Sequence, residues 1–226
     1  MKLLALDTAT ENCSAALLIG AQLLEREFES ARGHAEHLLP MIEALLREAG
    51  VRLGALDALV FGRGPGSFTG VRLAASITQG LAFAADRPVV AVSDLAAVAQ
   101  RALTLDPDCA DVLVCNDARM GEVYWAPYTR RAGLAAPGGA EQVSPPAAVR
   151  SAQAVGVAGA GRGFAAYPDL AAQAGVVVPA GWERLLPRAS DLLRLAVPEV
   201  EAGRMLSAQD ALPIYVRDVV AKPSLT

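Results

Sequence analysis

Cysteine and histidine are scarce in this sequence of 226 residues, and long uncharged apolar runs are missing. The three cysteines, Cys13, Cys109 and Cys115, include no C-x-x-C pair, so the pattern favours reduced thiols over a disulfide framework. No apolar stretch is long and charge-free enough to span a bilayer. The N-terminal segment reaches Asp7 without the apolar core of a signal peptide. We therefore expect a cytoplasmic protein that does not bind membranes.

Positive charge is also limited. Lysine occurs only at Lys2 and Lys222, the formal net charge is −4, and no long basic run is present. A protein that neutralises many phosphates by itself is usually basic. If RNA is involved, a partner must therefore supply most of the positive surface. Hydrophobic residues make up 53% of the chain, which is enough for a sizeable core in one large domain or two small ones.

Apolar periodicity predicts alternating strands and helices in the first half of the chain. Three short strands come first, followed by helix, strand, helix, strand and helix. Residues 34–50 repeat apolar side chains at steps of three and four, which is typical of an amphipathic helix that begins or bends near Pro40. The predicted strands are residues 2–10, 13–20, 22–30, 56–62 and 87–94, and the other predicted helices are residues 71–86 and 94–104.

The second half of the sequence is less regular. Strands are predicted at residues 111–117, 121–129 and 154–163, a helix at 189–200, and a final strand or extended tail at 211–218. Leading antiparallel strands followed by alternating helices and strands are typical of an α/β fold with mixed sheets flanked by helices. We place a boundary near residue 105, which gives an N-terminal lobe at 1–105 and a smaller C-terminal lobe at 106–226.

A glycine-rich stretch, GRGPGSFTG at residues 62–70, joins a predicted strand to a predicted helix. It lacks the lysine that a P-loop places before Ser or Thr, and around Ser67 it does not match the G-x-S-x-G pattern of a nucleophile elbow. Backbone N–H groups near Gly64, Gly66 and Ser67, before a helix, could attract an anion. The alternative is a tight turn that needs glycine for positive φ or for close packing. The spacing leaves both interpretations open.

Asp7 ends the first predicted strand and is followed by Thr8 and Thr10. Actin-like and sugar-kinase-like ATPases place an acidic residue and hydroxyl groups here in their first phosphate loop, usually with a glycine where this chain has Ala9. The methyl group of Ala9 crowds such a loop. The turn is therefore either a degenerate nucleotide or anion site, or a strand end capped by polar side chains.

His34 and His37 are the only histidines in the sequence. Their spacing places them on roughly one side of a helix, but a metal site needs at least one further ligand. We expect an exposed pair that binds no metal. Asp117, Arg119 and Glu122 predict a charged hairpin whose side chains pair with one another, and a ligand contact is the alternative.

Five motifs, in this order, resemble the bacterial TsaB (YeaZ) family of glycoprotease-like proteins: LALDTATENCSAAL, GHAEHLLPMIEALL, GRGPGSFTGVR, DARMGEVYWA and ALPIYVRD. The resemblance spans nearly the whole chain, and GRGPGSFTGVR and DARMGEVYWA are its most specific parts. It implies a two-lobed actin-like ATPase (ribonuclease-H-like) fold with a reduced second lobe. The order of predicted strands and helices agrees with that fold.

The resemblance also implies a part in the synthesis of tRNA threonylcarbamoyladenosine (t6A). In that pathway the paralogue TsaD carries the metal and transfers the threonylcarbamoyl group to tRNA, TsaB pairs with TsaD, and the ATPase TsaE joins them. The implied role of this chain is non-catalytic, with tRNA bound only through the complex and a homodimer formed in the absence of TsaD. No cofactor is implied for the chain alone, whereas ATP or ADP can bind at the interface of the complex.

The partner interface of the family maps onto the two apolar helices of the first half. Seven residues there are candidate contacts: Leu38, Met41, Ile42, Leu45, Arg72, Ala75 and Thr78. Arg72 lies in the first turn of its helix, where a cation opposes the helix dipole, which suggests an acidic group on the partner. By resemblance, the glycine-rich stretch is a turn that sets the second helix for docking. The alternatives are a glycoprotease-type metallopeptidase and a nucleotide-binding regulator that uses the turn at residues 7–10.

Overall fold

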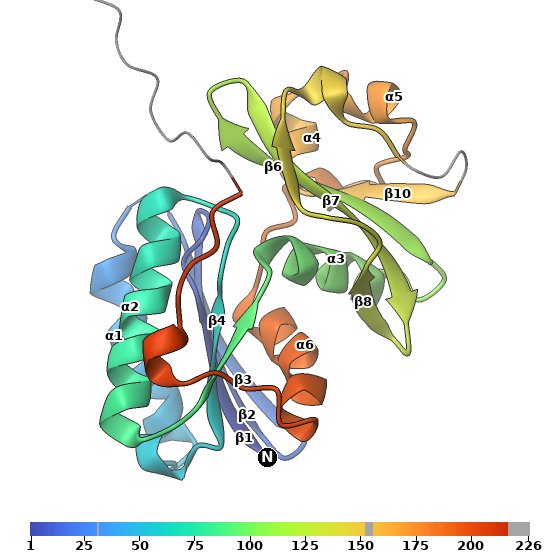
Figure 1. The fold of residues 1–226 in the computed structure, drawn as a ribbon. Helices are drawn as coiled ribbons and strands as arrows, with labels where there is room; N and C mark the ends of the chain where they lie inside the picture. The colour runs from blue at the N-terminus through green and yellow to red at the C-terminus, as the bar shows by residue number, and fades with distance from the viewer. Residues whose placement is uncertain (31, 152–155, 217–226) are drawn as a thin grey trace, which may run out of the picture.

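Two mixed sheets form two lobes in the computed structural model, which describes residues 1–30, 32–151 and 156–216 (Figure 1). The first sheet has the order β3-β2-β1-β4-β5. Its strands are β1 (Lys2–Asp7), β2 (Asn12–Ile19), β3 (Gln22–Glu29), β4 (Ala58–Gly62) and β5 (Val89–Val92). The β1, β2 and β3 strands pair antiparallel, whereas β4 and β5 add in parallel. This arrangement confirms the predicted order and fold class.

Helices cover both faces of the first sheet because the central strands are apolar on both sides. Helices α1 (His34–Glu48) and α2 (Phe68–Ala85) pack on the face that includes Leu4 and Leu6. Helix α6 (Ala189–Glu201) packs on the opposite face. Successive strand residues point to opposite faces, so one continuous apolar strand supplies two separate cores.

The second sheet has the order β10-β6-β7-β8, with β9 paired to β7. Its strands are β6 (Asp111–Arg119), β7 (Glu122–Arg131), β8 (Leu134–Pro137), β9 (Gln142–Ser144) and β10 (Val157–Ala160). Helix α3 (Asp94–Leu105) covers one face, and the short helices α4 (Gly163–Ala166) and α5 (Leu170–Ala174) pack on the other. The 3-10 turns are η1 (Leu53–Ala55), η2 (Pro146–Ala148), η3 (Trp182–Arg184) and η4 (Ala208–Asp210).

Two helices pack across the predicted lobe boundary at residue 105. Helix α3 lies before that boundary, but its apolar side chains pack mainly on the second sheet. Helix α6 lies far beyond it and packs on the first sheet, next to β1, β2, β4 and β5 (Figure 1). The chain therefore crosses between the lobes twice.

The chain after α6 remains on the first lobe. Leu206 pairs with Val89 at the edge of β5, and Ala211 is buried in the core beneath α2. Residues 206–216 then run beside α2 to the cleft between the lobes (Figure 1). We call residues 206–216 the C-terminal strap. Of the final strand or extended tail predicted at 211–218, residues 211–216 form no strand and match the tail alternative, and residues 217 and 218 lie outside the described part.

The local predictions for the helices hold with small shifts. Helix α1 begins at His34 and continues through Pro40, so the alternative that it begins near Pro40 is wrong. Helix α2 begins at Phe68, a few residues earlier than predicted. Ser67 and Ser93 cap α2 and α3, because each side chain accepts a hydrogen bond from a backbone N–H in the first turn. Among the described residues, no helix is long and apolar enough to cross a membrane.

Candidate functional site

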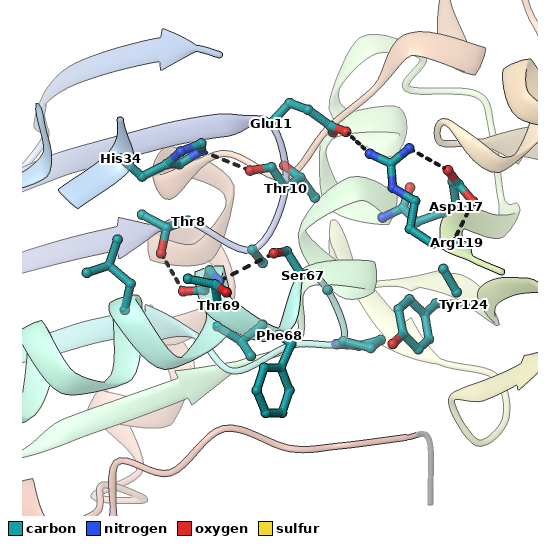
Figure 2. A pocket seen from close by; sticks show the side chains of 18 of the residues that line it. Thr8, Thr10, Glu11, His34, Ser67, Phe68, Thr69, Asp117, Arg119 and Tyr124 are labelled. Carbon is teal, nitrogen blue, oxygen red and sulfur yellow. Dashed lines mark hydrogen bonds and ion pairs between the residues drawn. The ribbon is translucent and has the colours of Figure 1, made fainter. Parts of the chain in front are cut away.

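A cavity of about 720 Å³ opens between the lobes. Its walls come from the turn after β1, the start of α1, the glycine-rich loop before α2, the β6–β7 hairpin and the end of the C-terminal strap. Figure 2 shows Thr8, Thr10 and Ser67 on the side of the first lobe, with Arg119 and Tyr124 on the side of the second. The cavity therefore occupies the position where a two-lobed fold usually binds its ligand.

The glycine-rich loop is packed tightly against the turn after β1. A Cβ atom on Gly70 would overlap the carbonyl oxygen of Thr8, and one on Gly66 would overlap Ala9. The Ser67 N–H donates to the Ala9 carbonyl oxygen at 2.7 Å, and the Thr8 hydroxyl donates to the Gly70 carbonyl at 2.7 Å. These two glycines are thus required by the close approach of two backbone segments.

Only some residues of the predicted nucleotide or anion site reach the cavity. Asp7 and Gly64 are buried and do not line the cavity, whereas Thr10, Gly66 and Ser67 do. The Gly64 N–H donates to the buried carboxylate of Asp94, so it cannot face a phosphate. Two N–H groups of the loop, those of Gly64 and Ser67, are therefore used within the protein. The geometry favours the tight-turn interpretation of the loop.

The carboxyl groups beneath the cleft are strongly perturbed. Burial raises the pKa of Asp7 above its ordinary value, although the neighbouring Asp94 carboxyl and the hydrogen bond from the Ala9 N–H oppose the shift. Burial raises the pKa of Asp94 well above its ordinary value, and the neighbouring Asp7 charge raises it further. The sequence singled out Asp7 but not Asp94, which follows the next strand but one in the sheet and carries no motif of its own.

The two histidines do not converge on a common ligand. The His34 ring nitrogen Nε2 lies 3.0 Å from the Thr10 carbonyl oxygen. The His37 ring packs against Phe28, with ring centroids 4.1 Å apart. Within the described ranges, no group of three or more His, Cys, Asp or Glu side chains is placed to bind a metal ion.

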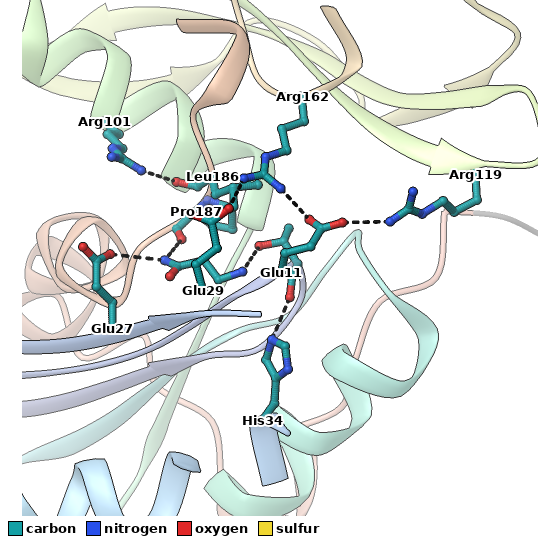
Figure 3. Close-up of polar contacts among 11 residues, drawn as sticks. Glu11, Glu27, Glu29, His34, Arg101, Arg119, Arg162, Leu186 and Pro187 are labelled. Carbon is teal, nitrogen blue, oxygen red and sulfur yellow. Dashed lines mark hydrogen bonds and ion pairs between the residues drawn. The ribbon is translucent and has the colours of Figure 1, made fainter. Parts of the chain in front are cut away.

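Ion pairs connect the two lobes at the edge of the cleft (Figure 3). Glu11, in the turn after β1, lies 2.7 Å from Arg119 of the β6–β7 hairpin and 3.5 Å from Arg162, which follows β10. Arg162 also pairs with Glu29 at the end of β3. The pairing of Arg119 with Asp117 at 3.1 Å confirms that part of the predicted hairpin. Glu11 and Arg162 are 151 positions apart in sequence, and no local pattern indicated their contact.

Most of the predicted partner contacts are internal. Leu38, Ile42, Leu45, Ala75 and Thr78 are buried within the protomer. The sheet of the first lobe already covers the apolar stripes of α1 and α2, so these five residues cannot contact a partner in this conformation. Met41 is half-buried and Arg72 is exposed, so these two stay candidates.

The outward sides of α1 and α2 offer different residues. Leu39 is 48% exposed and Phe83 is 84% exposed. Pro40, Ser76 and Gly80 are exposed as well. We call these five residues, together with Arg72, the outer helix surface. Sequence reasoning missed Leu39 and Phe83, although each is a large apolar residue beside the main stripe of its helix.

Arg72 has partners of its own in the protomer. Its guanidinium lies over the Phe68 ring, 3.5 Å from the centroid, and its Nε donates to the Tyr215 hydroxyl at 2.7 Å. The prediction that the helix dipole leaves Arg72 in need of an acidic partner therefore lacks its premise. An aromatic pair from α2 and the C-terminal strap already stabilises this cation.

Comparison with known proteins identifies the family. The family model for TsaD, described as tRNA N6-adenosine threonylcarbamoyltransferase, matches residues 28–162. The tRNA threonylcarbamoyladenosine biosynthesis protein TsaB of Haemophilus influenzae is 40% identical, over 97% of this chain and 95% of its own length. The protein of the same name from Escherichia coli is 41% identical, over 98% and 96%. This chain belongs to the TsaB family.

Solved structures agree with that family. YeaZ from Pseudomonas aeruginosa superposes with a TM-score of 0.88 at 48% identity, covering 95% of this chain and 99% of that one. A second structure, described as an uncharacterized protein with similarity to peptidase YEAZ from the same organism, gives a TM-score of 0.89 at 47% identity. It covers 96% of this chain and 99% of that one, so this TsaB-family chain shares its whole fold with those proteins.

Proposed function

We propose that this chain is a non-catalytic subunit of the machinery that makes t6A in tRNA, and that it binds and activates a TsaD-type transferase. The observation that carries the proposal is the nearly full-length identity to two proteins named for t6A biosynthesis. The chain is acidic overall, so tRNA contacts are assigned to the complex rather than to this subunit.

The interlobe cleft supports a non-catalytic role. The Gly64 and Ser67 N–H groups of the glycine-rich loop donate hydrogen bonds to acceptors within the protein, and the backbone of the loop packs against the turn after β1. An active phosphate loop would instead direct such N–H groups at the ligand. Catalysis is therefore assigned to TsaD, and any ATP or ADP is assigned to the interface of the complex.

The outer helix surface is the proposed docking site for TsaD. Leu39 and Phe83 are exposed apolar side chains on helices that the first sheet holds rigidly. Large exposed apolar groups on rigid elements are typical of protein interfaces. In the absence of TsaD, the same surface is proposed to pair two copies of this chain about a two-fold axis. TsaE is proposed to join the heteromeric complex.

The test is a reconstitution with purified components. This chain, TsaD and TsaE are combined with tRNA and threonylcarbamoyl-adenylate, and t6A is measured by mass spectrometry of the digested tRNA. We expect modification only when TsaD is present, and we expect the rate to fall strongly when this chain is omitted. Turnover by this chain without TsaD would contradict the non-catalytic assignment, and full activity of TsaD without this chain would contradict the activating role.

A peptidase function receives less support from the residues. A metallopeptidase needs ligands that converge on one ion, yet His34 contacts a backbone carbonyl and His37 packs on Phe28. The double variant His34→Ala/His37→Ala decides the point. If TsaD binding and t6A synthesis survive in that variant, the histidines have no essential chemical role.

A further inference from the structure

Two buried carboxyl groups meet beneath the floor of the cleft. Asp7 is the last residue of β1 and Asp94 is the first residue of α3, and both are fully buried. We call them the carboxyl pair. Asp7 Oδ1 accepts a hydrogen bond from the Ala9 N–H at 2.7 Å, and Asp94 Oδ2 accepts one from the Gly64 N–H. One oxygen of each group is thus accounted for.

The remaining oxygens face each other. Asp7 Oδ2 and Asp94 Oδ1 are buried, and no donor in the described part of the chain reaches either of them. Both oxygens lie close to Gly62, at the end of β4. A Cβ atom on Gly62 would overlap both of them. Gly62 is therefore the residue that lets the two carboxyl groups approach. An unpaired buried carboxylate oxygen is costly, so two of them in contact need an explanation.

The charged and titratable groups around the carboxyl pair do not neutralise it. Arg63, on the glycine-rich loop, is held by both oxygens of Glu141 at 3.1 and 3.2 Å. His34, on α1, is engaged with the Thr10 carbonyl. Cys13, on β2, has a thiol whose pKa is raised by burial to about 12, so it carries no charge. The pair therefore has no cation in direct contact among the described residues.

We propose that Asp7 and Asp94 share a single proton, with Asp94 Oδ1 donating it to Asp7 Oδ2. The proton comes from solvent during folding, and the pair then carries one negative charge instead of two. One hydrogen bond satisfies both orphan oxygens at once. Two like charges in contact inside a protein cannot both ionise at neutral pH, since neither solvent nor a cation compensates them.

The shared proton links three segments that shape the cleft. Through Ala9 the pair holds the turn after β1, through Gly64 it holds the glycine-rich loop, and through Asp94 it holds the start of α3, which packs on the second sheet. Loss of the proton would place two repelling charges between these segments. The pair therefore connects these segments of the two lobes through hydrogen bonds that depend on one proton. The proposed function above does not depend on it.

Carbon-13 NMR of the full-length protein labelled at the aspartate carboxyl carbons tests the proposal directly. Asp191, whose pKa burial raises to about 7, is also partly protonated at pH 7. Besides its signal, we expect one carboxyl carbon of the pair to keep the chemical shift of a protonated acid at pH 7, and only that signal to disappear in Asp94→Asn. The carboxyls of the pair titrate as one coupled system, so both signals should move together at alkaline pH. If both aspartates of the pair complete their titration below pH 5, the proposal is overturned.

Proton linkage provides the second readout. The folded pair holds a proton that the unfolded chain has released above about pH 4, so folding stability must fall as pH rises. We expect the unfolding equilibrium constant of the wild type to grow up to tenfold per pH unit relative to Asp94→Asn, whose amide donates to Asp7 at every pH. The control is Asp108→Asn, an exposed aspartate in the loop after α3, which should parallel the wild type. Equal pH slopes for the wild type and Asp94→Asn would overturn the proposal, and if Asp94→Asn fails to fold the wild-type NMR titration decides.

Discussion

A pair of leucines on α1 allows core packing to be tested separately from the proposed partner binding. Leu45 is fully buried against the first sheet, whereas Leu39 is 48% exposed on the outer helix surface. Deleting a buried leucine side chain costs about 2–5 kcal/mol, because transfer energy is lost and a cavity remains. Leu39→Ala loses only the half of its side chain that is buried, which is about 1 kcal/mol or less.

These energies predict distinct melting behaviour. For a chain of this length, each kcal/mol shifts the melting temperature by roughly 2–4 °C. A cost of about 3 kcal/mol for Leu45→Ala then lowers Tm by roughly 6–12 °C, and Leu39→Ala lowers it by about 4 °C at most. Thermal unfolding followed by circular dichroism measures both variants under the same conditions.

Binding should show the opposite order. An apolar anchor in an interface costs about 1–2 kcal/mol when truncated, which is roughly 5- to 30-fold in Kd. We expect Leu39→Ala to weaken TsaD binding by that factor, and Leu45→Ala to bind normally at 20 °C while it is still folded. Isothermal titration calorimetry measures both, with Leu105→Ala as the control because that residue is 59% exposed at the end of α3. The reasoning is refuted if Leu45→Ala loses binding at unchanged stability while Leu39→Ala binds like the wild type.

Three other predictions concern Arg72, Asp191 and two glycines of α2. Arg72→Ala removes the donor to the Tyr215 hydroxyl. We therefore expect faster hydrogen exchange in the C-terminal strap and weaker TsaD binding, with little change in Tm. Equal exchange in the wild type and the variant would contradict this. Burial raises the pKa of Asp191 to about 7, so between pH 4 and 7 the free energy of unfolding of the wild type should fall by about 1.4 kcal/mol per pH unit more than that of Asp191→Asn, which keeps the carboxyl pair. Urea unfolding of both forms at pH 5 and 8 measures this difference. Gly70→Ala should destabilise the chain by about 1–3 kcal/mol through a backbone overlap, whereas Gly80→Ala, with open space around it, should stabilise α2 by up to about 1 kcal/mol.

The first half of the fold could be predicted because its signals are local. The change from continuous apolar runs to a spacing of three and four marks the passage from β3 to α1, and Ser93 marks the start of α3. The second half could not be predicted as well. Its short strands β8 and β9 pair with β7 through the backbone, and their own residues carry little apolar alternation.

The assignment of helices to sheets had no local signal. Periodicity shows that α3 and α6 each have an apolar face, but not which sheet that face meets. In the structure α3 covers the second sheet and α6 returns to the first. The same limit explains why five of the seven predicted partner contacts are buried. The strongest apolar stripe of α1 is the face that the nearest sheet buries, so it indicates the core before it indicates a partner.

The glycine-rich loop shows why spacing alone could not define the site. A phosphate cradle and a tight inter-segment packing both require glycine, since each brings a second group close to the backbone. What separates them is the group that occupies the space, and here it is the backbone of Thr8 and Ala9. The backbone of Thr8 and Ala9 occupies the space beside Gly66 and Gly70, so an anion could bind to this loop only if the whole turn after β1 moved. The hydrogen bond between Asp7 and the Ala9 N–H opposes that movement. The backbone of this TsaB-family chain thus fills the space beside the glycine-rich loop, while the cavity between the lobes stays open. The outward sides of α1 and α2 are the surface that we propose for a partner.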